Sequence, residues 1–257
     1  MFRLAQLQRY LRFRKGSVNR HGVHSPFVFD FIEKVLRNRD SIPEVVEIEA
    51  MRRHLLKDGT LISPVDPGAG STSAGSRSIQ TVAKHSLSSP DQCRILYRMV
   101  KHFAPSTIIE LGTCLGISTA YLAAAGCERL ISLEGHPDLF KKAKDVLSTL
   151  DLKADLHEGL FNTSLDNILH DVGKVDMAFI DGHHTEEATL HYYDRLRPHL
   201  HENSVIIFDD IHWSEGMERA WETMKAREGV TLSIDLFWCG ILFFRKGLSG
   251  EHFKLRY

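Results

Sequence analysis

Two apolar, strand-like runs end in acids that a parallel sheet would place at one edge. In IIELGTCLGIST, from Ile108 to Thr119, Glu110 precedes a glycine turn and a helix-like segment, and Glu134 ends the next run, ISLE. Glycine lets the backbone approach a ligand closely, and the first N–H groups of a helix lack partners within it. A carboxylate at the end of the following strand can accept both hydroxyls of a ribose. The pattern predicts a site for a nucleoside-bearing cofactor.

This loop differs from the common nucleotide-binding loops. A dinucleotide fingerprint that starts at Gly112 would need glycines at Cys114 and Ile117, and no Gly-Lys-Ser/Thr sequence of a phosphate loop follows. A second glycine-rich stretch, DPGAGSTSAGSRS from Asp66 to Ser78, has Ser76 where a phosphate loop needs its lysine. We interpret it as part of a mobile lid over the substrate, with a plain linker as the alternative.

Three more carboxylates end two later strand-like runs. Asp181 ends AFID, and Asp209 and Asp210 end IIFDD. Neighbouring parallel strands would bring the three together, where each raises the pKa of the others. A divalent cation relieves that repulsion, and oxygen ligands suit Mg²⁺, Mn²⁺ or Ca²⁺ better than zinc. Alternatively, the Asp pair only caps a helix or holds a turn.

The elements that position these residues alternate regularly from Asp91 onward. Strands separated by helix-like segments predict a doubly wound α/β fold with a mainly parallel sheet. We count seven strands, the last two of which, in TLSIDLFWCGILFFRK, form an antiparallel C-terminal hairpin. The predicted organisation is an N-terminal helical extension with a lid or linker over residues 1–90, followed by a catalytic domain over residues 91–257.

Composition limits the partners and the compartment. A net charge of -1 over 257 residues gives no reason to expect nucleic acid, and four scattered cysteines favour reduced thiols in the cytoplasm. No apolar run is long enough to predict a membrane span. The basic N-terminal segment repeats Leu4, Leu7 and Leu11 at helical spacing. It either touches an anionic membrane or a polyanion, or docks on the body or on a second subunit in a homodimer.

The motifs ELGTCLGIST and SLEGHP resemble the first two motifs of class I S-adenosylmethionine-dependent methyltransferases. The resemblance covers residues 91–246, and the terminal hairpin is similar to that of this Rossmann-like fold. Within the class, the chain looks most like the catechol and caffeoyl-CoA O-methyltransferases. It also resembles a group of uncharacterised bacterial methyltransferases, mostly from the Bacteroidetes, with similar RHGVHSPF, GAGS and FDDIHW segments.

The resemblance implies roles for individual residues. The implied contacts of the cofactor are Glu110, Gly112, Thr113, Gly116 and Ser118 around its methionine part, Glu134 at the ribose, and Gly159, Leu160 and Phe161 beside the adenine. As the alternative to a metal ligand, Asp181 would bind the amino group of the cofactor through its backbone neighbours. The metal-dependent relatives carry an Asp and an Asp-Asn pair where this chain has Asp181, Asp209 and Asp210. His184 stands where they carry a lysine near the substrate hydroxyl.

The expected activity is methyl transfer from S-adenosylmethionine to a hydroxyl of a small molecule, assisted by a divalent cation. His184 would remove the hydroxyl proton, with Asp181 beside it. The alternatives are a cation-independent methyltransferase with a nitrogen or protein acceptor, and a non-catalytic protein that keeps the cofactor site.

Overall fold

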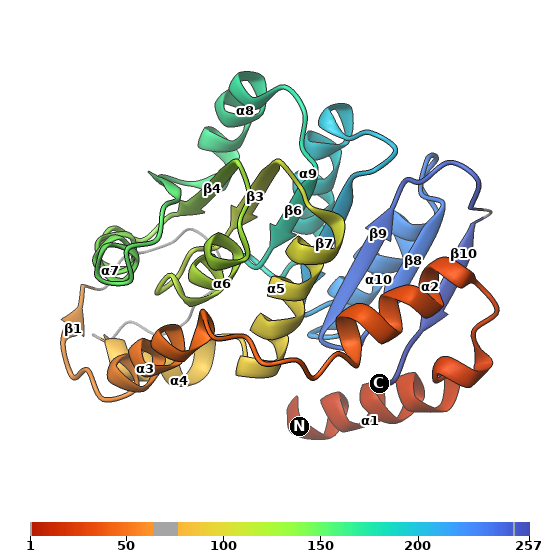
Figure 1. The fold of residues 1–257 in the computed structure, drawn as a ribbon, viewed down its shortest axis with the longest axis horizontal. Helices are drawn as coiled ribbons and strands as arrows, with labels where there is room; N and C mark the ends of the chain where they lie inside the picture. Colours follow the sequence, from red (N-terminus) through yellow and green to blue (C-terminus); the bar gives the residue numbers. More distant parts are fainter. Residues whose placement is uncertain (1, 64–76, 249) are drawn as a thin grey trace. The chain divides into compact units, whose positions relative to one another are not determined.

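The computed structural model describes residues 2–63, 77–248 and 250–257. The fold contains a mixed, mainly parallel sheet of eight strands and a separate sheet of two. The chain divides into two compact units, which Figure 1 shows in the colours of the sequence. We call residues 38–165 the central unit, and residues 1–37 with 166–257 the terminal unit.

The central unit carries three parallel strands in the order β3–β4–β5. Its elements are α3 (Val45–Leu55), β1 (Leu61–Ile62), β2 (Arg77–Ser78), α4 (Ile79–Ser86), α5 (Pro90–Phe103), β3 (Thr107–Leu111), α6 (Ile117–Ala125), β4 (Arg129–Glu134), α7 (Pro137–Thr149), β5 (Asp155–Glu158) and the start of α8 (Phe161–Val172). In the register, Glu110 lies opposite Ser132, and Glu134 lies opposite Glu158. The carboxyl ends of these strands therefore meet at one edge.

The terminal unit holds five strands in the order β10–β8–β9–β7–β6. Its elements are α1 (Phe2–Gly16), the 3-10 turn η1 (Arg20–Gly22), α2 (Pro26–Phe31), the π-helical turn η2 (Ile32–Leu36), β6 (Met177–Ile180), α9 (Glu186–Leu196), the 3-10 turn η3 (Arg197–His199), β7 (Val205–Asp209), α10 (Glu215–Lys225), β8 (Leu232–Asp235), β9 (Cys239–Phe243) and β10 (Glu251–Lys254). Strands β6 and β7 are parallel, whereas β9 runs antiparallel to both β7 and β8.

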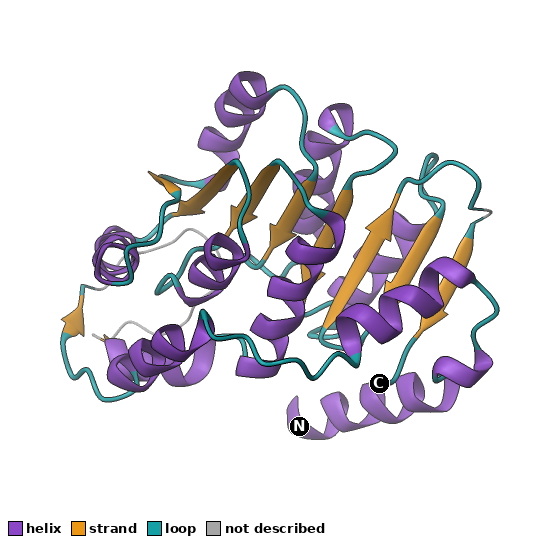
Figure 2. Ribbon diagram, in the orientation of Figure 1, coloured by secondary structure: helices purple, strands orange, loops and turns teal. Residues whose placement is uncertain are grey.

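Helices cover both faces of this part of the sheet, as Figure 2 shows for the orange strands and purple helices. Along β9, residues three apart point to opposite faces. On one face, Phe27 of α2 packs edge-on against Phe243, with ring centroids 5.3 Å apart. On the other, Trp221 of α10 lies so close to Gly240 that an added Cβ would sit 2.5 Å from its ring. Only glycine fits at this position, because any side chain would displace the buried indole.

The predicted α/β fold, parallel strands and terminal hairpin are confirmed. The strand count differs, since β10 pairs in parallel with β8 as an eighth strand. Its sequence, EHFK, is short and largely polar, as edge strands often are, and therefore lacks the apolar run that marks the others. The predicted lid or linker, Asp66 to Ser78, lies outside the described residues except for Arg77 and Ser78.

Candidate active site

The loop between β3 and α6 has the sharp turn that the sequence predicts. Gly112 has φ 108°, Cys114 has φ 50°, and Gly116 has φ 78°, so the chain passes through backbone conformations that glycine adopts without strain. A Cβ on Gly116 would lie 3.2 Å from the Cα of Ala143 in α7. Gly116 is the N-cap of α6 and has no side chain to cap the helix. The first N–H groups of α6 are therefore available for an anionic ligand group.

Glu134 ties this loop to the one that follows β4. Its Oε2 accepts a hydrogen bond of 2.7 Å from the N–H of Cys114, and its Oε1 accepts one of 2.8 Å from the N–H of His136. Burial raises the pKa of the Glu134 carboxyl, while these backbone donors act in the opposite direction. Each carboxylate oxygen has two lone pairs, so both keep capacity for a further donor such as a ribose hydroxyl.

Glu110 is held by hydroxyl groups inside the central unit, and its predicted contact with the cofactor stays a prediction. Its carboxylate is fully buried and accepts hydrogen bonds from the hydroxyls of Thr119 and Ser132. Ser132 also shares a hydrogen bond of 2.6 Å with Thr113, which is itself buried. Glu110 thus fixes the start of α6 against β4 from inside the unit. Sequence reasoning missed Thr119 and Ser132, although a serine within the apolar run RLISLE was a visible signal.

The loop after β5 completes the carboxyl edge of the central unit. The N–H of Gly159, which has φ 151°, donates a hydrogen bond of 2.9 Å to the carbonyl of Glu134. Leu160 is 51% exposed, and Phe161 is buried at the start of α8. Ser118, in the first turn of α6, is also buried. The structure therefore brings the loops after β4 and β5 together around Glu134.

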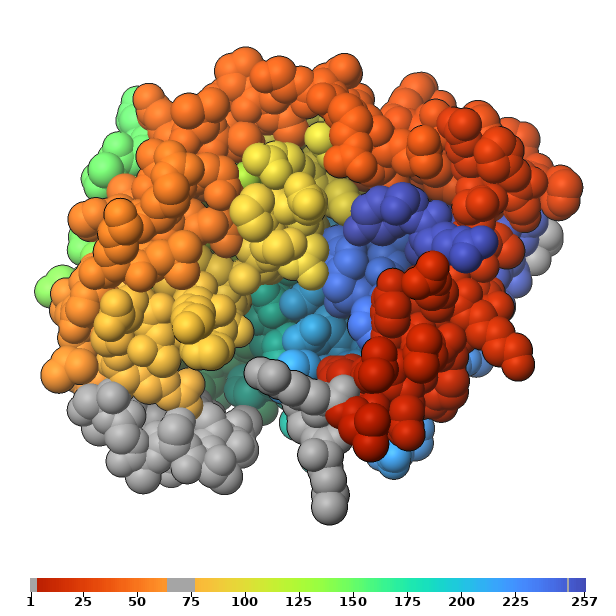
Figure 3. All heavy atoms as spheres, turned by 90° about the horizontal axis from the view of Figure 1, so that it is seen from below, coloured from red at the N-terminus to blue at the C-terminus, as the bar shows by residue number. Residues whose placement is uncertain are grey.

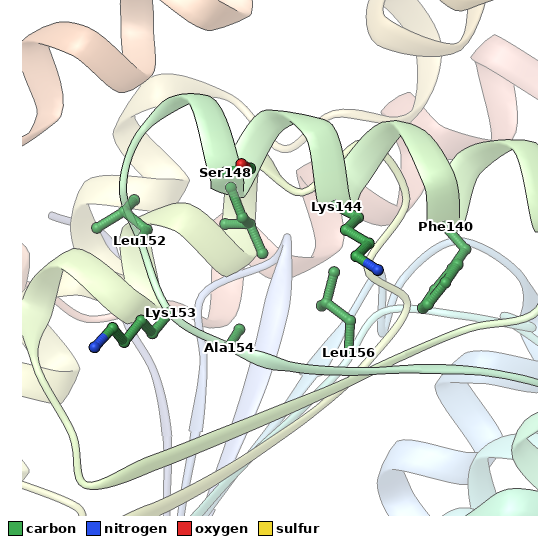
Figure 4. A pocket seen from close by; sticks show the side chains of 8 residues that line it. Phe140, Lys144, Ser148, Leu152, Lys153, Ala154 and Leu156 are labelled. Carbon is green, nitrogen blue, oxygen red and sulfur yellow. The ribbon is translucent and has the colours of Figure 1, made fainter.

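A pocket of about 340 Å³ in the central unit lies elsewhere, between α7 and β5. Figure 4 shows Phe140, Lys144 and Leu156 around this hollow. Its other lining residues are Leu147, Ser148, Leu152, Lys153 and Ala154. None of these described residues belongs to the predicted site, so the pocket does not mark it.

In the terminal unit, the three predicted acids lie at the ends of β6 and β7. Ile180 pairs with Phe208, so the next residues, Asp181 and Asp209, are neighbours at the carboxyl edge. Each of the two carboxyl groups influences the pKa of the other. Asp210 follows in a left-handed conformation with φ 53°, and its N–H donates to the carbonyl of Trp238 at 2.7 Å. The predicted convergence of the acids is observed.

Burial and mutual repulsion make these carboxyl groups weak acids. Burial raises the pKa of Asp181 to about 6. Burial, together with the charges of Asp181 and Asp210, raises the pKa of Asp209 well above its usual value. Burial raises the pKa of Asp210 as well. The cluster therefore retains protons at a pH where isolated aspartates are ionised.

His184 lies beside this cluster. Its Nε2 is 3.5 Å from Oδ1 of Asp181. The preceding residue, His183, has φ 59°, and its Nδ1 lies 2.6 Å from the hydroxyl of Tyr192 in α9. Burial lowers the pKa of His183, and the neighbouring His184 lowers it further. The structure thus places His184 next to the acids, while the side chain of His183 contacts Tyr192 of α9.

The carboxylates are not arranged as a ready coordination shell. Across the ranges that the structure describes, no group of three or more His, Cys, Asp or Glu side chains is disposed to hold a metal ion. The set of Asp181, Asp209 and Asp210 stays a prediction as a metal site.

His212, a neighbour of these acids in the sequence, has a structural role. Its Nδ1 lies 2.9 Å from Glu218, its Nε2 lies 2.9 Å from Asp235, and its ring stacks on Phe237 with centroids 5.0 Å apart. Burial lowers the pKa of His212, but the two carboxylates outweigh burial and raise it overall. The buried imidazole is therefore held between two acids.

Comparison with known proteins relates this chain to methyltransferases. Residues 109–211 match a family model described as a methyltransferase domain. The chain carries a methyltransferase domain. The match begins within β3 and includes the acidic cluster and all the predicted cofactor residues, and it confirms the predicted enzyme class. No curated protein matches the sequence of the chain.

Solved methyltransferases have the same fold at low sequence identity. A Podospora anserina methyltransferase bound to S-adenosylhomocysteine is 13% identical, with a TM-score of 0.62 over 90% of this chain and 100% of that one. A Bacillus cereus O-methyltransferase in complex with S-adenosylhomocysteine is 17% identical, with a TM-score of 0.55 over 90% and 99% of the two chains. A Staphylococcus aureus protein, provisionally assigned as a caffeoyl-CoA O-methyltransferase, is 15% identical, with a TM-score of 0.58 over 85% and 97%. These similarities confirm the class I methyltransferase fold.

Proposed function

We propose that the protein transfers the methyl group of S-adenosylmethionine to a hydroxyl group of a small molecule, assisted by a divalent cation. One observation carries the proposal. Within a methyltransferase domain, Asp181, Asp209 and Asp210 form a cluster of carboxyl groups with raised pKa values at the carboxyl ends of β6 and β7. Such a cluster can hold a cation and an acceptor oxygen.

The central unit has the groups that S-adenosylmethionine requires. Glu134 ends β4 with lone pairs left for the ribose hydroxyls, and the N-terminus of α6 offers N–H groups to the methionine carboxylate. Gly112 and Gly116 leave room for close approach of the cofactor, and the loop from Gly159 to Phe161 would border the adenine. When bound, the cofactor supplies an electrophilic methyl group on a positively charged sulfur.

The donor chemistry of the acidic cluster fits a hard divalent cation such as Mg²⁺, Mn²⁺ or Ca²⁺. Asp181, Asp209 and Asp210 offer only oxygen atoms. Burial raises the pKa of all three, while the charge of His184 acts in the opposite direction on Asp181 and Asp210. Bound there, the cation would lower the pKa of an acceptor hydroxyl.

His184 is our proposed general base. Its Nε2 lies beside Asp181, which can orient the ring and stabilise the imidazolium form after proton uptake. Removal of the hydroxyl proton leaves an oxygen nucleophile that attacks the methyl carbon as the bond from carbon to sulfur breaks. The proton ends on His184, and S-adenosylhomocysteine leaves as the second product.

A second candidate is methyl transfer to an amine without a cation. The raised pKa values of Asp181 and Asp209 favour it, because carboxyl groups that retain protons need no metal to relieve their repulsion. In that case the acids would orient an amino group directly. The homodimer, the cytoplasmic location and the domain boundary near residue 90 also stay predictions.

A matched pair of acceptors distinguishes the two candidates. Formation of S-adenosylhomocysteine would be measured with catechol and with o-phenylenediamine, each with Mg²⁺ and with EDTA. We expect turnover of catechol that EDTA abolishes. Turnover of the diamine alone, unaffected by EDTA, would support the second candidate and contradict the first.

The role of His184 needs its own variants. His184→Ala should lower kcat by about 10²- to 10⁴-fold and leave cofactor binding unchanged. His170→Ala, an exposed histidine in α8, is the matched control and should keep full activity. Full activity of His184→Ala would remove this residue from the mechanism.

A further inference from the structure

Helix α1 is fixed to the terminal unit by one side. Gln6 Nε2 donates to the carbonyl of Trp213 at 3.3 Å, and Arg9 forms a salt bridge of 3.5 Å with Glu218. The ring of Phe13 packs 5.4 Å from that of Phe237, measured between centroids. Figure 1 shows α1 beside the C-terminal segment, and Figure 3 shows its red residues next to the blue ones of that segment. The inward side of α1 is therefore docked on the unit.

The opposite side of α1 carries a row of leucines that face away from the unit. Leu4, Leu7 and Leu11 are 61%, 52% and 54% exposed. Their spacing of three and four residues puts them on one face of the helix, roughly opposite Arg9 and Phe13. Leucines exposed singly are common, but an aligned row of three on a docked helix suggests a contact surface.

Basic residues border this leucine row. Arg14 and Lys15 follow Leu11 at spacings of three and four, so they flank the row on its two sides, and both are exposed. Neither forms a salt bridge among the residues that the structure describes. The first acid of the sequence is Asp30, so no carboxylate within residues 1–29 offsets these charges.

We propose that this face of α1 is a docking surface for a lipid bilayer that contains anionic lipids. The leucine row would enter the boundary between headgroups and acyl chains, while Arg14 and Lys15 pair with anionic headgroups. The protein would lie on the membrane and not span it. No described helix has the length and apolar character that crossing a bilayer requires.

Charge and apolarity together favour this partner over the others. A second copy packed in parallel on the same face would bring Arg14 and Lys15 close to the same charges of its partner, with repulsion as the result. An antiparallel copy would offer them no acidic partner on α1, because residues 1–29 contain no carboxylate side chain. Nucleic acid would be bound by the basic residues but would leave the leucines in water. An anionic bilayer satisfies both kinds of side chain. The inference does not depend on the proposed methyl transfer.

Cosedimentation of the full chain with lipid vesicles tests the proposal. We expect binding to vesicles of phosphatidylcholine mixed with phosphatidylglycerol, weaker binding to phosphatidylcholine alone, and weakening by salt. The double variant Leu7→Ser, Leu11→Ser should reduce the partition coefficient by about tenfold or more. Arg14→Glu with Lys15→Glu should abolish the preference for anionic vesicles.

Matched variants distinguish binding through this surface from nonspecific adsorption of the protein to vesicles. Val46→Ser with Leu61→Ser removes two exposed apolar side chains of the central unit, and Arg53→Glu with Lys57→Glu reverses two exposed charges there. Both controls should bind vesicles like the wild type, and circular dichroism should show that every variant is folded. Equal binding of all variants, or no preference for anionic vesicles, would overturn the proposal. It would also be overturned if ultracentrifugation showed a dimer that the leucine variant disrupts while vesicle binding persists.

Discussion

Asp181 and Asp209 lie side by side at the carboxyl ends of two parallel strands, because Ile180 of β6 pairs with Phe208 of β7. Two neighbouring carboxylates repel each other when both are ionised. Burial raises the pKa of Asp181 to about 6, and the neighbouring charges act with burial on Asp209. Ionisation of both groups is therefore unfavourable in the folded protein, mainly because both are buried.

The raised pKa of Asp181 predicts how the free energy of unfolding depends on pH when no metal is bound. Because the folded protein holds Asp181 protons more tightly than the unfolded chain, this group lowers stability as pH rises from 3.8 to about 6. Asp209→Asn removes the like charge, so at pH 8 in EDTA the variant should be more stable than the wild type by about 1 kcal/mol. Denaturant titrations at pH 4 and pH 8 measure this, and the gain should shrink at pH 4. Asp145→Asn, at an exposed acid of α7, should show no such gain, and equal changes in both variants would contradict the interpretation.

Glu134 should control cofactor affinity. Glu134→Gln replaces the carboxylate that receives N–H bonds from Cys114 and His136, and one amide group cannot accept both. Calorimetric titration with S-adenosylhomocysteine should show a loss of about 10- to 150-fold in affinity, as expected for hydrogen bonds to a charged group. The control is Glu158→Gln, since Glu158 lies opposite Glu134 in the register of β4 and β5 and is exposed. Equal affinity of the two variants would remove Glu134 from the cofactor site.

Two glycines, one at each end of α6, distinguish the energetic cost of backbone strain from that of steric crowding. Gly116 and Gly126 both have positive φ, but only at Gly116 would an added Cβ meet a neighbour, Ala143, at 3.2 Å. Gly126→Ala should cost about 1 kcal/mol from strain alone, and Gly116→Ala about 1–3 kcal/mol more. Thermal unfolding of the two variants gives the comparison. Equal destabilisation of the two variants would show that α7 shifts to accommodate the added Cβ without a further loss of stability.

The network around His212 predicts a loss of stability at alkaline pH. Both ring nitrogens face carboxylates, Glu218 and Asp235, and both can donate only in the protonated ring. Since the pKa of His212 is raised in the folded state, its contribution is complete below pH 6.5 and is lost as pH rises through the folded pKa. His212→Gln should therefore cost about 1–3 kcal/mol at pH 6 and less at pH 9. The exposed His170→Ala is the control, and a cost that does not change with pH would contradict a protonated His212.

The sequence predicts the regular part of this protein well because local patterns determine it. The run IIEL, the glycine turn and ISTAYLAAA define a strand, a loop and a helix by periodicity alone. Other features depend on contacts between distant segments. Ser132 joins Glu110 only through the register of β3 and β4, and β10 forms only because β8 offers it an edge. No local pattern contains those pairings.

Selective binding of the cofactor tests the central claim most directly. Thermal unfolding of the wild type would be followed with S-adenosylmethionine, S-adenosylhomocysteine, NAD and ATP. A ligand at 100 times its Kd adds about 2.7 kcal/mol of stability, which shifts the midpoint clearly. We expect stabilisation by S-adenosylmethionine and S-adenosylhomocysteine only. Stabilisation by NAD or ATP, with no effect of either methionine derivative, would contradict the account.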